Sequence, residues 1–127
     1  MKNLFILLCI MFSFGCKKKN ELESKYYGKW ELSYTYGGFS GIKTDYPKGN
    51  GNIISFAGKN YEMYTNNKLV KSGTFSVVKA HSNIEQREVD KIVYDGEVGN
   101  IISLNDNLLS FGMDAYDGGS STYIKIN

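Results

Sequence analysis

The stretch Tyr27-Gly28-Lys29-Trp30-Glu31-Leu32-Ser33-Tyr34-Thr35-Tyr36 decides the fold class of this chain. Large apolar side chains stand at every second position from Trp30 onward, and smaller or charged side chains stand between them. A period of two is the spacing of a β-strand that buries one face. We therefore predict a strand near Tyr27–Tyr36, with Trp30, Leu32 and Tyr34 on its inner face.

The chain beyond this strand continues as short runs rich in Tyr, Val, Ile, Phe and Thr, separated by turn residues. Beyond Lys25 no window of a dozen residues has a clear helical period. The runs predict further strands at 52–57, 61–65, 68–78, 88–94, 98–104, 108–113 and 122–126. Residues 37–51 read as a long irregular connection and 80–87 as a polar loop. Gly73 indicates a bulge, and the alternation within 88–94 does not assign an inner face.

About eight strands with mostly hairpin connections predict an all-β fold. An antiparallel up-and-down meander of this size closes naturally into a barrel, which removes exposed strand edges. A two-sheet β-sandwich is the alternative. An eight-stranded barrel is filled by its own side chains or has room for one small ligand. The residues expected in the interior, or lining a ligand, are Trp30, Leu32, Tyr34, Phe56, Met63, Phe75 and Phe111.

The first fifteen residues have the composition of a secretory signal. Met1-Lys2-Asn3 is positively charged, and Leu4 to Phe14 is apolar at ten of its eleven positions. Such a run matches a signal h-region, and it is shorter than the 18–20 or so residues that span a bilayer. The small Gly15 before Cys16 predicts cleavage between these two residues, which leaves Cys16 as the first mature residue.

Length, cysteine content and charge describe a single domain and argue against nucleic-acid binding. The 127 residues suit a single domain. No cysteine follows Cys16, so the domain holds no disulfide, and from Lys25 onward acidic and basic residues are equal in number. A neutral domain does not support a nucleic-acid-binding surface.

No group of residues suggests catalysis, a cofactor or a metal. His81 is the only histidine, and we expect it to be exposed in a loop without a catalytic partner. Asp114-x-x-Asp117-Gly118 lacks the alternating oxygen ligands of a calcium loop, so we interpret it as a turn. Tyrosine is abundant. Its side chains could line a polar-tipped cavity or stand half-buried on strands.

Two motifs resemble known families. Gly28-Lys29-Trp30 is similar to the Gly-x-Trp signature of lipocalins, whose Trp packs across the closed end of the barrel. Gly15-Cys16 resembles the end of a bacterial lipobox, from whose strict form Ser13 and Phe14 depart. Together with the stretches 72–75, 104–109 and 121–125, they resemble the short lipocalin-like domains of Gram-negative lipoproteins.

This resemblance implies an exported outer-membrane lipoprotein, with its periplasmic or surface face left open. It implies a signal peptide at 1–15, an acylated (palmitate-bearing) Cys16 that binds the membrane, a flexible tether at 16–25 and a lipocalin-like barrel at 26–127. The leading expectation is a non-catalytic protein that binds a small, partly apolar molecule in the barrel.

The alternatives come from different function classes. The second is an interaction module with a filled barrel that contacts an envelope protein through residues 37–51. An enzyme of unknown type is third. A cavity of about 300 Å³ or more, lined by Tyr and aliphatic side chains, would favour the ligand.

Overall fold

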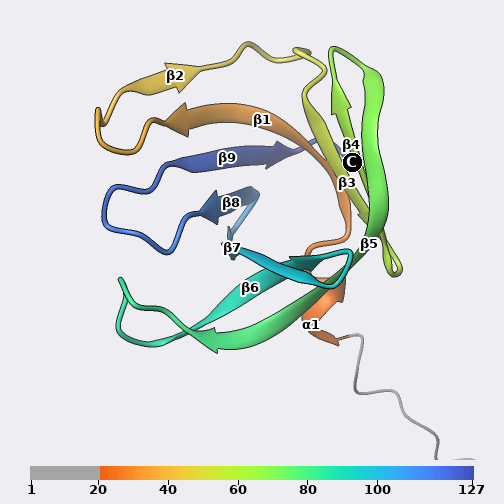
Figure 1. Cartoon of the computed structure of the whole chain (residues 1–127). Helices are drawn as coiled ribbons and strands as arrows, with labels where there is room; N and C mark the ends of the chain where they lie inside the picture. The colour runs from red at the N-terminus through yellow and green to blue at the C-terminus, as the bar shows by residue number, and fades with distance from the viewer. Residues whose placement is uncertain (1–20) are drawn as a thin grey trace, which may run out of the picture.

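The computed structural model describes residues 21–127 (Figure 1). The predicted signal peptide, Cys16 and the first part of the predicted tether lie outside the described residues. Within residues 21–127, one short helix precedes nine strands. The elements are α1 Glu21–Ser24, β1 Gly28–Tyr36, β2 Lys43–Asp45, β3 Ile53–Ala57, β4 Asn60–Thr65, β5 Lys68–His81, β6 Glu88–Tyr94, β7 Glu97–Asn105, β8 Leu108–Gly112 and β9 Ser120–Lys125.

The strands form one antiparallel meander, which confirms the all-β prediction. Their order in the sheet is β2-β1-β3-β4-β5-β6-β7-β8-β9, and β1 also pairs with β9. Hydrogen bonding therefore runs in a ring through β1 and β3 to β9. The additional strand is β2, which lies in the stretch predicted to be irregular. It pairs with the end of β1 through Tyr34–Tyr36, whereas β3 pairs with the beginning of β1 through Gly28–Glu31.

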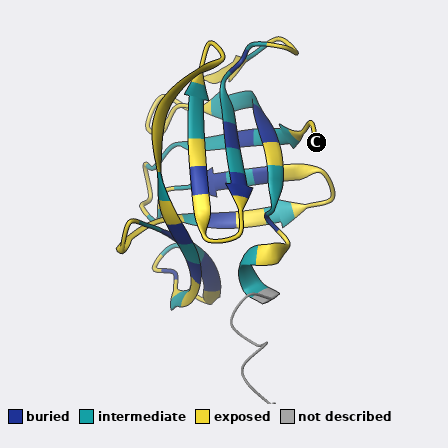
Figure 2. Cartoon of the chain, turned by 90° about the vertical axis from the view of Figure 1, so that its right-hand side faces the viewer, coloured by how far each residue is buried: buried dark blue, intermediate teal, exposed yellow. Residues whose placement is uncertain are grey.

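The core lies between two groups of strands that cross each other. In Figures 1 and 2, β3, β4 and the first part of β5 run across β1, β9, β8 and β7. The long strands β1 and β5 bend to serve both groups. Apolar side chains from nearly every strand of the ring meet in between. The buried cluster comprises Tyr26, Trp30, Ile54, Phe56, Tyr61, Phe75, Val77, Ile92, Ile102, Leu109 and Phe111.

Strand β6 is buried on both faces, which explains why its alternation could not be interpreted. Ile92 belongs to the core cluster and is fully buried, but Val89 and Val93 on the other parity are also buried. The bulge expected at Gly73 is misplaced, because the β4–β5 register shifts between Met63 and Tyr64, opposite Lys71 and Leu69. At Gly73 a Cβ would lie 2.1 Å from Asp95 Oδ1, so the carboxylate occupies the space that a side chain would need.

Helix α1 and the residues after it are attached to the sheet, although 21–25 falls in the predicted tether. Leu22 packs against the core, and Glu23 Oε1 accepts a hydrogen bond from Val77 N at 3.0 Å. Tyr26 is buried, and its hydroxyl donates to Asp90 Oδ2 at 2.9 Å. These contacts extend the ordered domain to the N-terminal side of residue 26.

Asp90 is the ionic centre of this attachment, and it makes folding stability pH-dependent. Lys25 Nζ lies 2.8 Å from Oδ2, and Lys79 Nζ lies 2.5 Å from Oδ1. Burial by itself raises the pKa of Asp90, but the bonds from Lys25, Lys79 and Tyr26 outweigh burial and lower the pKa from 3.8 to about 2. The ionised form is therefore favoured in the folded protein.

The sign of this linkage gives a testable pH profile. A carboxyl with a lowered folded pKa stabilises the protein above its unfolded pKa, and the contribution disappears as the pH falls through the folded value. We expect about 2 kcal/mol of unfolding free energy to be lost from this group between about pH 4 and pH 2. Urea titrations across this range should show a flatter profile for Asp90→Asn than for the wild type. Parallel profiles would contradict the assignment.

Candidate functional site

Three loops meet at the end of the molecule away from α1, and we call residues 37–42, 82–87 and 113–119 the loop end (Figure 1, left). The first and third loops touch without intervening side chains. A Cβ on Gly38 would lie 1.9 Å from the Asp117 carbonyl oxygen, and one on Gly119 would lie 2.9 Å from the Tyr36 carbonyl oxygen. Glycine at these positions is therefore a condition for the loops to be in contact.

Large apolar side chains on these loops point into solvent. Phe39 is 95% exposed and Tyr116 is 91% exposed. Ile42, Met113 and Tyr36 are also exposed, at the edges of the same two loops. Single exposed apolar residues are ordinary on a soluble protein, but several together on adjoining loops are typical of an interaction surface.

The rest of the predicted contact, residues 43–51, is held against the sheet instead. Glu31 is buried, and its carboxylate accepts hydrogen bonds from Gly49 N at 2.7 Å and Gly51 N at 3.4 Å. Asn50 Nδ2 donates to the Leu32 carbonyl oxygen at 2.8 Å. The second half of the predicted 37–51 contact is therefore hydrogen-bonded to the sheet, and the large exposed apolar side chains of the stretch, Phe39 and Ile42, belong to its first half.

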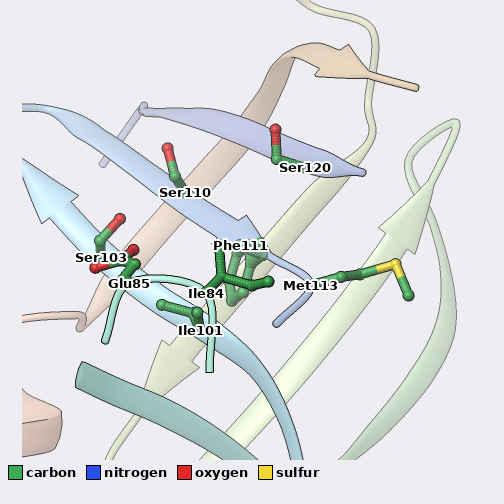
Figure 3. Close-up of a pocket in the computed structure, with 9 residues that line it drawn as sticks. Ile84, Glu85, Ile101, Ser103, Ser110, Phe111, Met113 and Ser120 are labelled. Atoms are coloured by element: carbon green, nitrogen blue, oxygen red, sulfur yellow. The ribbon is translucent and has the colours of Figure 1, made fainter. Parts of the chain in front are cut away.

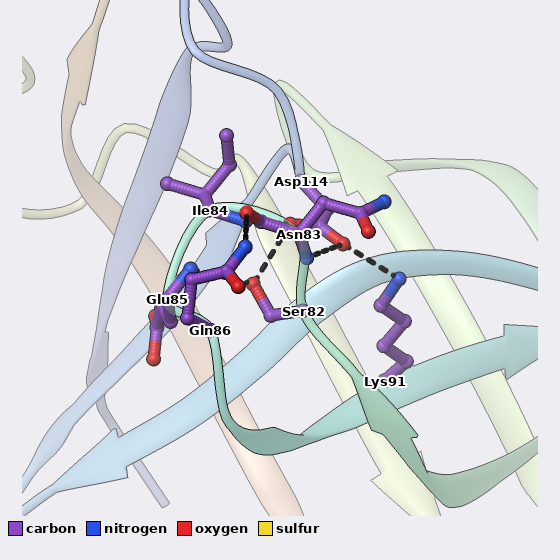
Figure 4. A network of polar contacts seen from close by, with 7 residues as sticks. All are labelled: Ser82, Asn83, Ile84, Glu85, Gln86, Lys91 and Asp114. Carbon is purple, nitrogen blue, oxygen red and sulfur yellow. Dashed lines mark hydrogen bonds and ion pairs between the residues drawn. The ribbon is translucent and has the colours of Figure 1, made fainter.

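Asp114 fixes the loop 82–87 to the end of β8 (Figure 4). Its carboxylate accepts hydrogen bonds from Ser82 Oγ at 2.8 Å and from the backbone N–H groups of Asn83 and Ile84, each at 3.2 Å. Lys91 Nζ lies 3.0 Å from Oδ2. The hydrogen bond from Ser82 and the ion pair with Lys91 are the main reasons why the pKa of Asp114 lies well below its usual range. Burial acts in the opposite direction and raises this pKa.

Neutralising Asp114 should loosen the loop end. Asp114→Asn keeps the size of the side chain but removes the charge that three hydrogen bonds and Lys91 share. Hydrogen bonds to a charged group are worth about 1.5–3 kcal/mol each, so we expect a loss of about 2 kcal/mol in unfolding free energy. Urea unfolding measures this loss. Asp117→Asn, on an exposed residue of the same loop, is the matched control and should change stability by less than about 0.5 kcal/mol.

A shallow pocket of about 160 Å³ lies beside these loops (Figure 3). Ile101, Ser103, Ser110 and Gly112 line it from β7 and β8, at positions that alternate with the core residues Ile102, Leu109 and Phe111. The pocket therefore opens on the face of the sheet opposite the core, under Ile84 and Glu85. Its volume is below the roughly 300 Å³ at which pockets for metabolite-sized ligands begin. Met113, Ser120 and Phe111 complete its lining.

The residues predicted to lie in the interior separate into three groups. Trp30, Phe56, Phe75 and Phe111 are buried in the core cluster, and Met63 packs against that cluster. The rings of Phe56 and Phe75 are 4.6 Å apart between centroids, and those of Phe56 and Phe111 are 6.5 Å apart. These side chains therefore pack against one another inside the ring of strands.

Leu32 and Tyr34 lie outside that cluster. The register of β1 against β9 shifts between them, so Leu32 pairs with Tyr123 but Tyr34 pairs with Thr122 on the other face. The Tyr34 ring contacts the ring of Tyr36 at 5.7 Å between centroids, and Lys43 Nζ lies 4.6 Å from its centroid. The shift thus turns Tyr34 from the expected inner face toward β2.

Three tyrosines do lie on the inner face. Tyr61 is buried and donates a hydrogen bond to Asp95 Oδ2 at 2.8 Å, and its ring lies 4.7 Å from that of Tyr94. Burial raises the pKa of both Tyr94 and Tyr123, and each ring packs against the core cluster. The proximity of Tyr123 and Tyr61 raises the pKa of Tyr94 further.

No arrangement for metal binding occurs in residues 21–127, where no three His, Cys, Asp or Glu side chains come together. His81 is exposed, at the last position of β5. Within the same residues no helix is long and apolar enough to cross a membrane.

Comparison with protein-family models, with curated proteins and with solved structures found no match. The loop end combines exposed apolar side chains with contacts between loops that are distant in the sequence.

Sequence reasoning missed two features of the loop end. Nothing in the spacing of Asp114 indicates that it binds Ser82, more than thirty residues earlier. The contact of Gly38 with Asp117 is equally long-range. One signal was available. Phe39 and Tyr116 stand in glycine-rich stretches, where a large apolar side chain does not belong to the buried face of a strand.

Proposed function

We propose that this protein is a non-catalytic lipoprotein, anchored to the outer membrane by acyl chains on Cys16, whose lipocalin-like barrel presents the loop end to another envelope protein. The observation that carries the proposal is the contrast between aromatic side chains packed together inside the ring of strands and large apolar side chains exposed on loops that touch each other. Phe56, Phe75 and Phe111 occupy the space inside the ring of strands, while Phe39 and Tyr116 stand almost fully in solvent.

The composition of the loop end suits protein recognition. Aromatic residues and methionine are enriched at interfaces, and a few of them contribute most of the binding energy. Phe39, Met113 and Tyr116 supply these residue types. The Asp114 hydrogen bonds and the close approach at Gly38 hold the loops in place, which lowers the entropy lost on binding. The pocket beside Met113 adds a recess that can receive one side chain of the partner.

The lipocalin-like part of the proposal is supported at the start of β1. Gly28 has φ +126°, and a Cβ there would lie 2.6 Å from the Asn127 carbonyl oxygen. Trp30 is buried two residues later, and its Nε1 donates to the Tyr26 carbonyl oxygen at 2.9 Å. Glycine followed at the second position by a plugging Trp is the arrangement that the Gly-x-Trp resemblance implies.

Site-specific photo-crosslinking in living cells tests the interaction. A photoreactive phenylalanine in place of Phe39 should yield one discrete protein adduct, identified by mass spectrometry. The same group in place of Leu69, 55% exposed on β5 and outside the loop end, is the matched control and should yield none. Adding Tyr116→Ser should reduce the Phe39 adduct about tenfold or more, as for an interface hot spot. Equal labelling from both positions, or no protein adduct from Phe39, would refute the proposal.

The second candidate function is the binding of a small, partly apolar molecule on the inner face of the barrel. The observation in its favour is the pair Tyr94 and Tyr123, whose rings pack against the core while their hydroxyls make no hydrogen bond in the part of the chain described. Native mass spectrometry of the purified protein should then show a retained ligand that Tyr94→Phe with Tyr123→Phe releases. A mass equal to that of the acylated chain alone would remove this candidate.

A further inference from the structure

We infer that the domain stands on an anionic bilayer surface with its α1 side against the headgroups and its loop end turned away from them. This inference rests on the acyl anchor proposed above. It specifies where the partner of the loop end must be. It also decides whether the exposed aromatic side chains of the loop end contact a partner protein or insert into the membrane that holds the anchor.

The length of chain between the anchor and the domain sets the first constraint. Five residue steps separate Cys16 from Glu21, which span at most about 18 Å when fully extended. A domain of about 100 residues has a radius of gyration near 13 Å, hence a diameter of roughly 30–35 Å. The connection is therefore too short to pass around the domain and bring its opposite end to the membrane.

The attachment of α1 makes this constraint effective. Glu23 binds Val77 N, while Lys25 and Tyr26 both bind Asp90, so the point where the chain enters the domain is fixed to β5 and β6. From there β1 runs its nine residues, about 26 Å of strand, before it reaches the loop end after Tyr36. Figure 1 shows α1 at the bottom of the domain and the β1–β2 loop at its far left.

The lysines around α1 complement an anionic surface. Lys29, Lys59 and Lys125 are exposed and have no ion-pair partner among residues 21–127. Lys125 Nζ lies 5.4 Å from the Trp30 ring centroid. The Lys59 carbonyl oxygen accepts a hydrogen bond from Phe75 N, and the Phe75 side-chain ring contacts the ring of Tyr27.

Charge in the neighbouring sequence extends this complementarity. Glu21 and Glu23 of α1 and the exposed Asp106 in the adjoining β7–β8 turn offset part of the lysine charge, and Lys17, Lys18 and Lys19 add to it in the sequence. Each lysine near an anionic bilayer contributes about 1 kcal/mol of attraction.

A fluorescence experiment on the acylated full-length protein tests the orientation. Because no cysteine follows Cys16, one introduced cysteine can carry a dye: Ala57→Cys, next to the start of β1, or Ser40→Cys at the loop end. The protein is placed in vesicles of phosphatidylcholine and phosphatidylglycerol whose headgroups carry a nitroxide quencher. We expect quenching at position 57 to be at least threefold greater than at position 40. Equal quenching, or stronger quenching at position 40, would overturn the inference.

A charge variant separates the surface contact from the tether. Changing Lys29, Lys59 and Lys125 to glutamine should reduce quenching at position 57 in anionic vesicles, whereas Lys48, Lys68 and Lys71 changed in the same way should not. An unchanged signal in the first variant would refute the lysine contact.

The acylation state distinguishes failure of the inference from failure of the anchor. Mass spectrometry that finds Cys16 without acyl chains would refute the proposed anchoring. An acylated protein with equal quenching at both positions would refute the orientation alone.

Discussion

Replacing Cys16 by alanine should move almost all of the protein from the membrane fraction to the soluble fraction. Each acyl methylene buried in the bilayer contributes about 0.8 kcal/mol, and one chain alone binds only reversibly. A bacterial lipoprotein cysteine typically carries three chains, as the lipobox resemblance implies. Their removal eliminates most of the attraction, and the lysines that remain act only over about a Debye length. Fractionation at low and high salt measures the change.

Cys9→Ala is the matched control for this experiment. Cys9 lies inside the apolar run and is preceded by the large Leu8, so it does not meet the small-residue requirement before a processed cysteine. We expect this variant to remain in the membrane fraction with the wild-type acyl mass. A Cys16→Ala protein that stays in the membrane at high salt would show that the anchor lies elsewhere.

Trp30→Ala should cost about 3–5 kcal/mol of unfolding free energy, which is a large part of the stability of an ordinary domain. Trp30 is 1% exposed in the core and lies beneath Lys125. Its removal leaves a cavity and also deprives the buried Tyr26 carbonyl of the indole N–H bond. Urea unfolding, followed by tyrosine fluorescence or circular dichroism, measures the loss.

Two variants separate packing from hydrogen bonding at Trp30. Trp30→Phe retains much of the ring volume but not the donor, so we expect a loss of about 1–2 kcal/mol. Tyr116→Ala removes an aromatic ring that is 91% exposed, and its effect should be under about 0.5 kcal/mol. If Trp30→Ala is no worse than Tyr116→Ala, the description of Trp30 as the plug of the interior is wrong.

Local pattern predicted most strands of this fold because each strand buries one face. The bounds of β6 agree with the predicted run, and those of β1, β3, β4, β7, β8 and β9 differ by two residues or fewer at each end. The core residues Trp30, Phe56, Phe75 and Phe111 were identifiable for the same reason, since a large apolar side chain at alternate positions has to be removed from water.

The features that local pattern did not predict depend on distant partners. The strand β2 exists because Lys43–Asp45 pairs with the end of β1, and two of its own three residues are charged. Tyr34 lies on the face opposite to the predicted one because the β1–β9 register shifts, and no residue type in β1 indicates this shift. Helix α1 is short and polar, and its position follows from Glu23 and Lys25 reaching β5 and β6.

The candidate site shows the same division. Phe39 and Tyr116 could be recognised in the sequence as large apolar residues in glycine-rich loops, but not as members of one surface. Their two loops meet because Gly38 allows the backbone at Asp117 to approach, and because β1 and β9 are neighbours in the ring. Asp114 belongs to the same surface only through its bonds to the loop after β5.

By itself, the sequence of this protein determined an all-β meander, a set of core aromatics and the prediction of an acylated Cys16. These follow from side-chain periodicity and short motifs, which act within a few residues of one another. The tertiary structure alone decided how the aromatic side chains pack inside the ring of strands, that Tyr34 lies outside this cluster and that the loops at Gly38 and Asp117 come into contact. Such outcomes depend on strand register and close packing, where a shift of one residue exchanges the two faces of a strand.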